Sequence, residues 1–177
     1  MGYDRRNNAR ERKTMTTNLL DYLGDKMDAL DFDGDLDLNW DKEAHVFELE
    51  LTMYTEAAGE FAVEDQDGRE IQDGEIDYSD AILFYDQTRL KGADYADNYL
   101  TTIGFAGKKG LDQAHLDGFF VYLQTLLNDG QSDLFDFVDG TSSAETFALT
   151  FDEAAYAAAV AAQPAAAHTT WIPYPKY

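Results

Sequence analysis

Carboxylate side chains fill most odd positions of one short segment, residues 31–41, and carboxylates at such spacing can bind calcium. An EF-hand loop has Asp or Asn at its first, third and fifth positions, Gly at the sixth and Glu at the twelfth. In a loop that starts at Asp31, Leu36 occupies the sixth position and Lys42 occupies the twelfth. The segment therefore fails the calcium motif, and we expect no metal there.

The same segment has the two-residue period of a β-strand, with apolar side chains at most even positions. Alternate side chains of a strand point to opposite faces, so we expect a half-buried strand with one strongly anionic face. A long acidic loop at 65–80 could extend that surface toward a partner. The predicted members of this partner surface are Asp31, Asp33, Asp35, Asp37, Asp67, Asp73 and Glu75.

Other side chains with catalytic chemistry form no motif. The histidines His45, His115 and His168 lack metal-binding spacing, and no Gly-x-Ser-x-Gly elbow occurs. With 35 acidic residues, any two carboxylates could be paired, and no apolar setting singles out one pair. We therefore assign no catalytic, metal-binding or cofactor-binding residue and expect no cofactor.

A basic cluster, Lys108-Lys109 between two glycines, interrupts the acidic body of the chain. It lies between a predicted strand and a predicted helix N-terminus, where backbone N–H groups also favour anions. Lys108 and Lys109 are thus a candidate anion site for a phosphate or carboxylate. The cluster lacks the spacing of a P-loop, so a plain basic turn is the other interpretation.

The composition restricts the partners. A net charge of −22 opposes binding to nucleic acid or anionic lipid and favours a basic protein partner. The chain has no cysteine, which excludes disulfides and thiolate chemistry, and no apolar run reaches the roughly 20 residues that span a bilayer. We expect a cytoplasmic protein that binds neither nucleic acid nor membrane, whereas its oligomeric state is not determined by the sequence.

The chain divides at its N-terminus. Residues 1–14 hold five basic and two acidic side chains without apolar periodicity, so we expect a disordered basic extension, upstream of an alternative start at Met15. Residues 15–177 are long enough for one domain with a substantial core.

The apolar periodicity of residues 15–177 predicts an α+β fold, a single domain with an antiparallel-rich sheet of five or six strands and helices on one face. A helix at 17–30 precedes strands at 31–41 and 47–53, which should pair antiparallel. The remaining elements are a short strand at 61–63, a buried central strand at 81–85, a strand at 99–105, a main helix capped by Asp112 and ended by Asp129-Gly130, a short helix at 134–138, a strand at 147–151, and a helix capped by Asp152 and ended by Pro164. The aromatic tail, residues 171–177, should dock on this body.

Several of these segments resemble one known family. They are Ile82-Leu83-Phe84-Tyr85, the Phe105–Leu111 junction, Asp133-Leu134 with Asp136-Phe137, and the end Tyr174-Pro175-Lys176-Tyr177. Together they resemble domain-of-unknown-function family 3013 of lactic acid bacteria and streptococci, over roughly residues 17–177. That family has no established activity, so the resemblance implies lineage and a cytoplasmic setting only.

These observations favour a non-enzymatic protein-binding module that uses an anionic surface. One alternative is a carboxylate-dependent enzyme that acts on a small phosphorylated or acidic ligand held near Lys108 and Lys109. Another is a binder of unfolded segments, like a secretion chaperone, which rests on analogy of element order alone. An enzyme would need acids that converge in a concave site, whereas a binding module can use a flat charged face.

Overall fold

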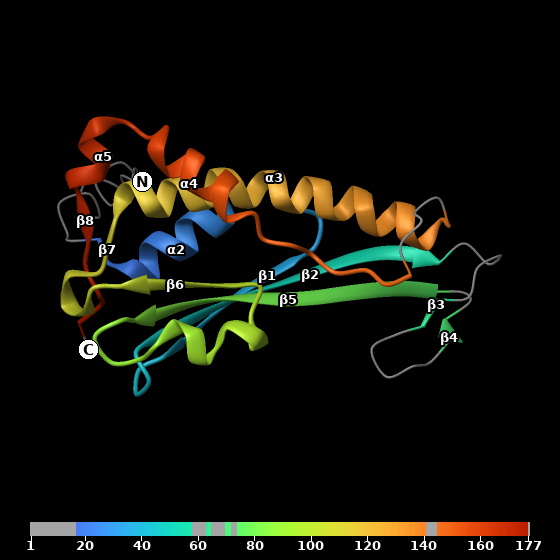
Figure 1. Cartoon of the computed structure of the whole chain (residues 1–177), viewed down its shortest axis with the longest axis horizontal. Coiled ribbons are helices and arrows are strands. Elements are labelled where there is room, and N and C mark those ends of the chain that lie inside the picture. The colour runs from blue at the N-terminus through green and yellow to red at the C-terminus, as the bar shows by residue number, and fades with distance from the viewer. Residues whose placement is uncertain (1–16, 58–62, 65–69, 72–73, 141–144, 177) are drawn as a thin grey trace, which may run out of the picture.

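The computed structural model describes residues 17–57, 63–64, 70–71, 74–140 and 145–176 of the chain. Its main sheet has four strands in the spatial order β1 (Asp35–Asp41), β2 (Val46–Ala57), β5 (Gly74–Asp86) and β6 (Thr101–Phe105). β2 pairs antiparallel with both β1 and β5, whereas β6 pairs parallel with β5. The sheet is therefore mixed, and β2 and β5 form its long central ribbon (Figure 1).

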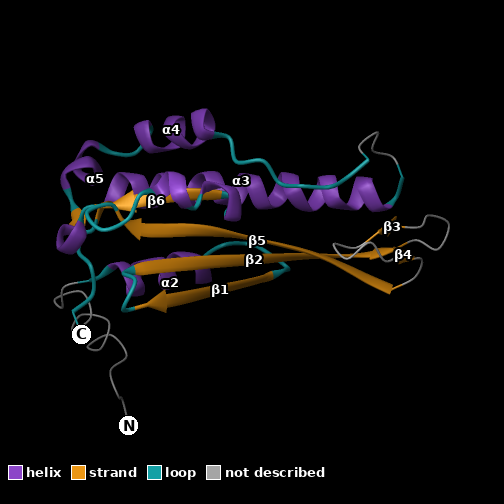
Figure 2. Ribbon diagram, turned by 60° about the horizontal axis from the view of Figure 1, so that its bottom comes forward, coloured by secondary structure: helices purple, strands orange, loops and turns teal. Residues whose placement is uncertain are grey.

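Helices cover one face of this sheet. α2 (Leu19–Asp28) and α3 (Gln113–Val138) lie directly on it, and α4 (Glu153–Ala161) packs on the far side of α3 (Figure 2). The short α5 (Ala165–Thr169) leads back toward the start of α3. The α+β prediction with helices on one face is confirmed, but the main sheet has four strands rather than the predicted five or six, and one of its pairings is parallel.

Smaller elements connect these parts. Two short strand pairs are separate from the main sheet, namely β3 (Val63–Glu64) with β4 (Glu70–Ile71) and β7 (Leu111–Asp112) with β8 (Trp171–Ile172). Three single-turn 3-10 helices are η1 (Gly92–Asp94), η2 (Ala96–Asn98) and η3 (Gly107–Lys109). No helix in the described ranges is long and apolar enough to cross a membrane.

Local sequence explains where the helices begin. The Asn18 side chain accepts a hydrogen bond from the Asp21 N–H at the start of α2. Asp112 accepts from the His115 N–H at the start of α3, and Asp152 caps α4 in the same way. Side-chain caps of this kind satisfy N–H groups that have no partner inside the helix. The predicted caps Asp112 and Asp152 are therefore confirmed.

The core lies between the sheet and α3. Four inward side chains of β2 are fully buried, namely Phe47, Leu49, Leu51 and Met53. Phe84 on β5 meets Phe119 on α3 edge to face, with 5.3 Å between ring centroids. The predicted central strand is confirmed, because Ile82, Leu83 and Phe84 are at most 2% exposed.

Two glycines let segments approach α3 closely. A Cβ at Gly118 would lie 2.7 Å from the Val160 backbone, so this glycine allows α4 to pack tightly on α3. A Cβ at Gly130 would lie 2.6 Å from a Leu149 methyl carbon. The prediction that the main helix ends at Asp129-Gly130 was wrong, because Gly130 is a packing position inside a helix that continues to Val138.

The prediction of a strand at 147–151 was also wrong. This segment runs along α3 without pairing to a strand, and aromatic contacts hold it there. Phe147 meets the Tyr78 ring and Phe151 meets the Tyr122 ring, each at 4.8 Å between centroids. An alternating apolar pattern can therefore also indicate an extended segment outside any sheet, in which each aromatic side chain packs against a different ring.

Strand boundaries differ from prediction in three places. β1 begins at Asp35 rather than residue 31, and β5 begins at Gly74 inside the predicted loop 65–80. The predicted third strand does not join the main sheet, because Val63–Glu64 pairs with Glu70–Ile71 instead. The start of β5 was missed because Glu75, Asp77 and Ser79 point outward and make this half-buried strand look like a polar loop. The predicted extension 1–14 lies outside the described residues.

The aromatic tail docks on the body, as predicted. Tyr174 is 7% exposed and its ring packs against Phe47 and Phe105 of the sheet and stacks on His45 at 4.8 Å. Its hydroxyl accepts a hydrogen bond of 2.8 Å from the Trp40 indole N–H. Tyr177 lies outside the described residues.

Backbone contacts fix the same tail. The Pro173 carbonyl accepts from the Leu19 N–H at 2.9 Å, and the Tyr174 N–H donates to the Lys108 carbonyl at 3.1 Å. Gly110 has a φ of 80°, and a Cβ there would lie 1.8 Å from the Ile172 carbonyl oxygen. Only glycine suits this position, both for its backbone conformation and for the close approach of β8.

Candidate functional site

Acidic side chains gather on the face of the main sheet that is turned away from α2 and α3. Strand register defines this face, because residues directly opposite each other point the same way. It contains the outward side chains of β1, β2 and the first half of β5. We call it the open acidic face, and its members are Asp35, Asp37, Asp41, Glu48, Glu50, Glu56, Glu75 and Asp77.

Like charges oppose each other directly on this face. Asp37 pairs with Glu50 across β1 and β2, and Glu56 pairs with Glu75 across β2 and β5. Like charges at such positions destabilise a sheet. The salt bridges of Lys26 with Asp117 and of Arg89 with Asp86 involve no member of the open acidic face.

Tyrosines are the hydroxyl donors to this face. The Tyr54 hydroxyl donates to Asp35 at 2.5 Å, and the Tyr99 hydroxyl donates to Glu48 at 2.7 Å. The hydrogen bond to Asp35 raises the pKa of Tyr54 to about 12, and burial raises the pKa of Tyr99 to about 12. Both phenols therefore stay protonated at neutral pH and leave the negative charge of the face in place.

One segment covers part of the outward side of the sheet. Residues 87–100, which contain η1 and η2, lie on the side opposite the helices (Figure 1). Leu83 points to that side and is only 2% exposed, and Tyr99 reaches across to Glu48. The covered part lies over β5 and β6, whereas Asp37 and Glu50 toward β1 stay exposed.

The structure corrects part of the predicted partner surface. Asp35, Asp37 and Glu75 do lie on the open acidic face. Asp31 does not, because its backbone N–H and carbonyl both bond to the Gln124 side chain of α3 at 2.8 Å. It is therefore held on the helix side of the sheet.

Asp33 also lies outside the strand, in the bend that precedes β1. Asp67 and Asp73 lie outside the described residues. The predicted surface lacked five members of the face, which are Asp41, Glu48, Glu50, Glu56 and Asp77. The alternation of Glu48, Glu50 and Thr52 along β2 could have revealed Glu48 and Glu50, once the two strands were paired.

A hollow lies at the hairpin end of the open acidic face. Its lining combines outward residues of β1 and β2 with the turn that joins them. The lining residues are Asn39, Trp40, Asp41, Lys42, Glu43, Val46 and Glu48. Neither Lys108 nor Lys109 is among them.

The candidate anion site takes part in holding the tail. Both lysine side chains are exposed, and the Lys109 ammonium lies 3.9 Å from the centroid of the Trp171 ring. The Lys108 carbonyl accepts a hydrogen bond from Tyr174. The geometry thus shows how a basic turn fastens β8 and the tail, through a cation–π contact and a backbone bond.

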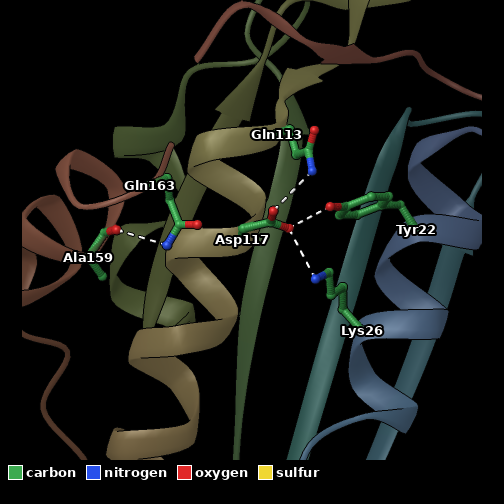
Figure 3. Close-up of polar contacts among 6 residues, drawn as sticks. All are labelled: Tyr22, Lys26, Gln113, Asp117, Ala159 and Gln163. Atoms are coloured by element: carbon green, nitrogen blue, oxygen red, sulfur yellow. Dashed lines mark hydrogen bonds and ion pairs between the residues drawn. The ribbon is translucent and has the colours of Figure 1, made fainter. Parts of the chain in front are cut away.

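A polar cluster joins α2 to α3 (Figure 3). Asp117 on α3 accepts from the Tyr22 hydroxyl at 2.5 Å and from the Gln113 amide at 3.2 Å, and Lys26 lies 3.3 Å from it. Burial, aided by Asp117, raises the pKa of Tyr22 well above its ordinary value. With three donors around one carboxylate and a neutral phenol, the cluster is suited to docking α2 rather than to proton transfer.

A second titratable cluster lies at the start of α3. The Asp112 oxygens lie 2.7 and 2.9 Å from Nδ1 of His115, whose imidazole is about half exposed. Tyr156 is buried nearby, burial raises its pKa, and its hydroxyl has no hydrogen-bond partner in the described part of the chain. Asp112 therefore orients the imidazole through its Nδ1 atom.

The cluster at the start of α3 is separate from the hollow at the β1–β2 hairpin. A general base needs a substrate position beside it, and the hollow at the β1–β2 hairpin does not include His115. Over the described ranges, no three His, Asp or Glu side chains are placed to hold a metal ion. The open acidic face, by contrast, gathers eight acidic residues on one side of three neighbouring strands.

Comparison with known proteins extends these findings. The family model described as "Protein of unknown function (DUF3013)" matches residues 14–176. A crystal structure of a conserved protein of unknown function from Enterococcus faecalis is 32% identical in sequence, with a TM-score of 0.76. The match covers 92% of this chain and 98% of the other. None of the curated proteins is significantly similar to this chain.

Proposed function

The chain belongs to the DUF3013 family of proteins of unknown function, and we propose that it is a non-enzymatic module that binds a basic protein on its open acidic face. The single observation that carries this proposal is that like-charged residues lie directly opposite each other in the strand register, Asp37 with Glu50 and Glu56 with Glu75. Such pairs oppose folding, so a stable fold alone gives no reason for them. A partner that brings Lys or Arg between these carboxylates would turn the repulsion into attraction.

Electrostatics gives the proposal a physical basis. The described acids of the face point to one side of three neighbouring strands, and the chain as a whole carries a charge of −22. A surface of one sign raises the rate at which an oppositely charged partner associates and repels partners of like charge. The hollow at the hairpin end gives this face a concave region.

The other two interpretations receive less support. A carboxylate-dependent enzyme would hold its small phosphorylated or acidic ligand near Lys108 and Lys109, whereas the Lys109 ammonium already lies over Trp171. Binding of unfolded segments is compatible with an acidic face only when the segment is basic. Both therefore have less support than a basic protein partner.

A charge-matched pair of variants tests the proposal. The face variant carries Asp37→Asn, Glu50→Gln, Glu56→Gln and Glu75→Gln. The helix variant carries the same number of neutralised acids on α2 and α3, which are exposed on the other side of the sheet, namely Asp25→Asn, Asp28→Asn, Asp129→Asn and Asp133→Asn. Each variant and the wild type are immobilised, and proteins captured from a native lysate are quantified by mass spectrometry.

We expect basic proteins to be retained by the wild type and the helix variant and to be lost from the face variant. Captured proteins should also elute with moderate salt, because exposed charges are screened over about 10 Å at 0.1 M ionic strength. If the face and helix variants capture the same proteins, the open acidic face is not the binding surface and the proposal is wrong.

A further inference from the structure

β1 is an edge strand of the main sheet. It pairs with β2 on one side, and no strand in the described residues pairs with its other side. In a strand, backbone N–H and C=O groups of alternate residues point to opposite edges. Every second residue of the seven in β1 therefore offers hydrogen-bonding groups away from β2. An edge of this kind is a template for a further strand.

Apolar side chains along β1 are only partly covered. Leu36, Leu38 and Trp40 point toward the core and are half-buried, whereas their β2 neighbours Leu51, Leu49 and Phe47 are fully buried. The difference follows from position, since an edge strand has a neighbour on one side only. An added strand with apolar residues at alternate positions would cover this row.

The acidic side chains of β1 determine which kind of strand can pair with its free edge. The outward side chains Asp35, Asp37 and Asp41 would face identical carboxylates if a second copy of β1 added to this edge. Like charges opposite each other destabilise the pairing, so self-association along this edge is disfavoured. A strand with Lys or Arg at alternate positions would instead place opposite charges across the new pair.

Protection of the exposed edge of β1 does not account for all acids of the open acidic face. Protective charges belong on edge strands, where they prevent pairing between copies. The open acidic face continues onto β2 with Glu50 and Glu56, and β2 is paired on both sides. Acids in that interior position guard no edge. Glu50 lies directly behind Asp37, so it is two strand spacings, about 10 Å, from a strand added at β1, which a long basic side chain and the glutamate side chain can span together.

We infer that the free edge of β1 accepts an extended basic segment of a partner protein as an additional strand of the main sheet. Basic side chains at every second position face Asp35, Asp37 and the acids of β2, and apolar side chains between them cover Leu36 and Leu38. Backbone hydrogen bonds supply part of the affinity, as in other cases of strand addition. The inference rests on the proposed function and specifies the conformation of the partner.

Two peptides of identical composition test the inference. The first, Lys-Val-Lys-Thr-Lys-Val-Lys, alternates basic and β-forming residues and matches the seven residues of β1. The second, Lys-Lys-Lys-Lys-Val-Val-Thr, has the same charge and composition without the alternation. Isothermal titration at low salt gives both dissociation constants, and amide hydrogen exchange by NMR follows the backbone of β1.

We expect the alternating peptide to bind at least about tenfold more tightly, a difference of about 1.4 kcal/mol. Exchange should slow at alternate amides of β1, namely those that point away from β2. Equal binding of both peptides without slowed exchange in β1 would overturn strand addition and leave the acidic face as a binding surface. If neither peptide binds, strand addition and the proposed function both fail.

Discussion

Truncation of Tyr174 to alanine should strongly destabilise the fold, although this residue is only three positions from the end of the sequence. Its ring is 7% exposed and lies among Trp40, His45, Phe47 and Phe105. Removal would leave a cavity where the tail, the β1–β2 hairpin and the sheet meet.

The magnitude follows from the burial of this side chain. Truncation of a fully buried aromatic residue to alanine costs about 3–5 kcal/mol. Because Tyr174 is 7% exposed rather than fully buried, we expect the lower end of this range, about 3 kcal/mol, for Tyr174→Ala. For a chain of this size, each kcal/mol lowers Tm by about 2–4 °C, which gives a decrease of about 6–12 °C.

Two variants in the same tail separate the contributions. Tyr174→Phe keeps the ring and removes the acceptor for the Trp40 indole N–H, at a cost of about 1 kcal/mol. Trp171→Ala removes a side chain that is 38% exposed and its contact with Lys109, at a cost of about 1 kcal/mol. Urea unfolding followed by tryptophan fluorescence and by far-UV circular dichroism measures all three free energies. A loss for Tyr174→Ala no greater than that for Trp171→Ala would refute the stabilising role of the buried Tyr174 ring.

Three further predictions concern charge, packing and pH. Asp37→Asn should stabilise the fold by about 0.5 kcal/mol at low salt, because it relieves repulsion from Glu50, and the gain should vanish in urea unfolding at high salt. Gly118→Ala should destabilise the fold by about 1–3 kcal/mol, because a Cβ there would lie 2.7 Å from the α4 backbone. Gly24→Ala on α2 should instead stabilise it by about 0.5–1 kcal/mol, because a Cβ there has no atom within 4 Å and alanine favours the helix. Thermal unfolding of both variants checks this contrast. Burial raises the pKa of Tyr78 to about 12, so its neutral form stabilises the fold below pH of about 10 and this contribution is lost as the pH rises toward 12; unfolding free energies across that range should fall less for Tyr78→Phe than for the wild type.

Features set by neighbouring residues could be predicted from the sequence. The caps at Asp112 and Asp152 depend on a carboxylate and the next turn of helix, so three or four residues decide them. The buried strand at 81–85 was predictable because an unbroken apolar run has few other uses in a domain of this size. The pairing of β1 with β2 followed from a short turn between two alternating segments.

Features set by distant residues could not be predicted in this way. Glycine commonly ends a helix, but α3 continues through Gly130 to Val138. There the glycine makes room for the Leu149 side chain, which comes from a distant part of the sequence. The long β2–β5 ribbon joins residues separated by the acidic stretch, and only the partner strand shows that Glu75 belongs to a sheet. The candidate site could not be predicted in full for the same reason. Only the strand register shows that the outward acids of β2 lie on the open acidic face.

The central claim is that the open acidic face binds basic partners because of where its charges lie rather than because of the total charge. The dissociation constant of a hepta-lysine peptide, measured by isothermal titration at low salt for the face variant and the helix variant, tests this claim most directly. The two variants have equal net charge, so any difference between them reports position alone. We predict that the face variant binds at least about tenfold more weakly than the helix variant. Equal dissociation constants for the two variants would contradict the claim.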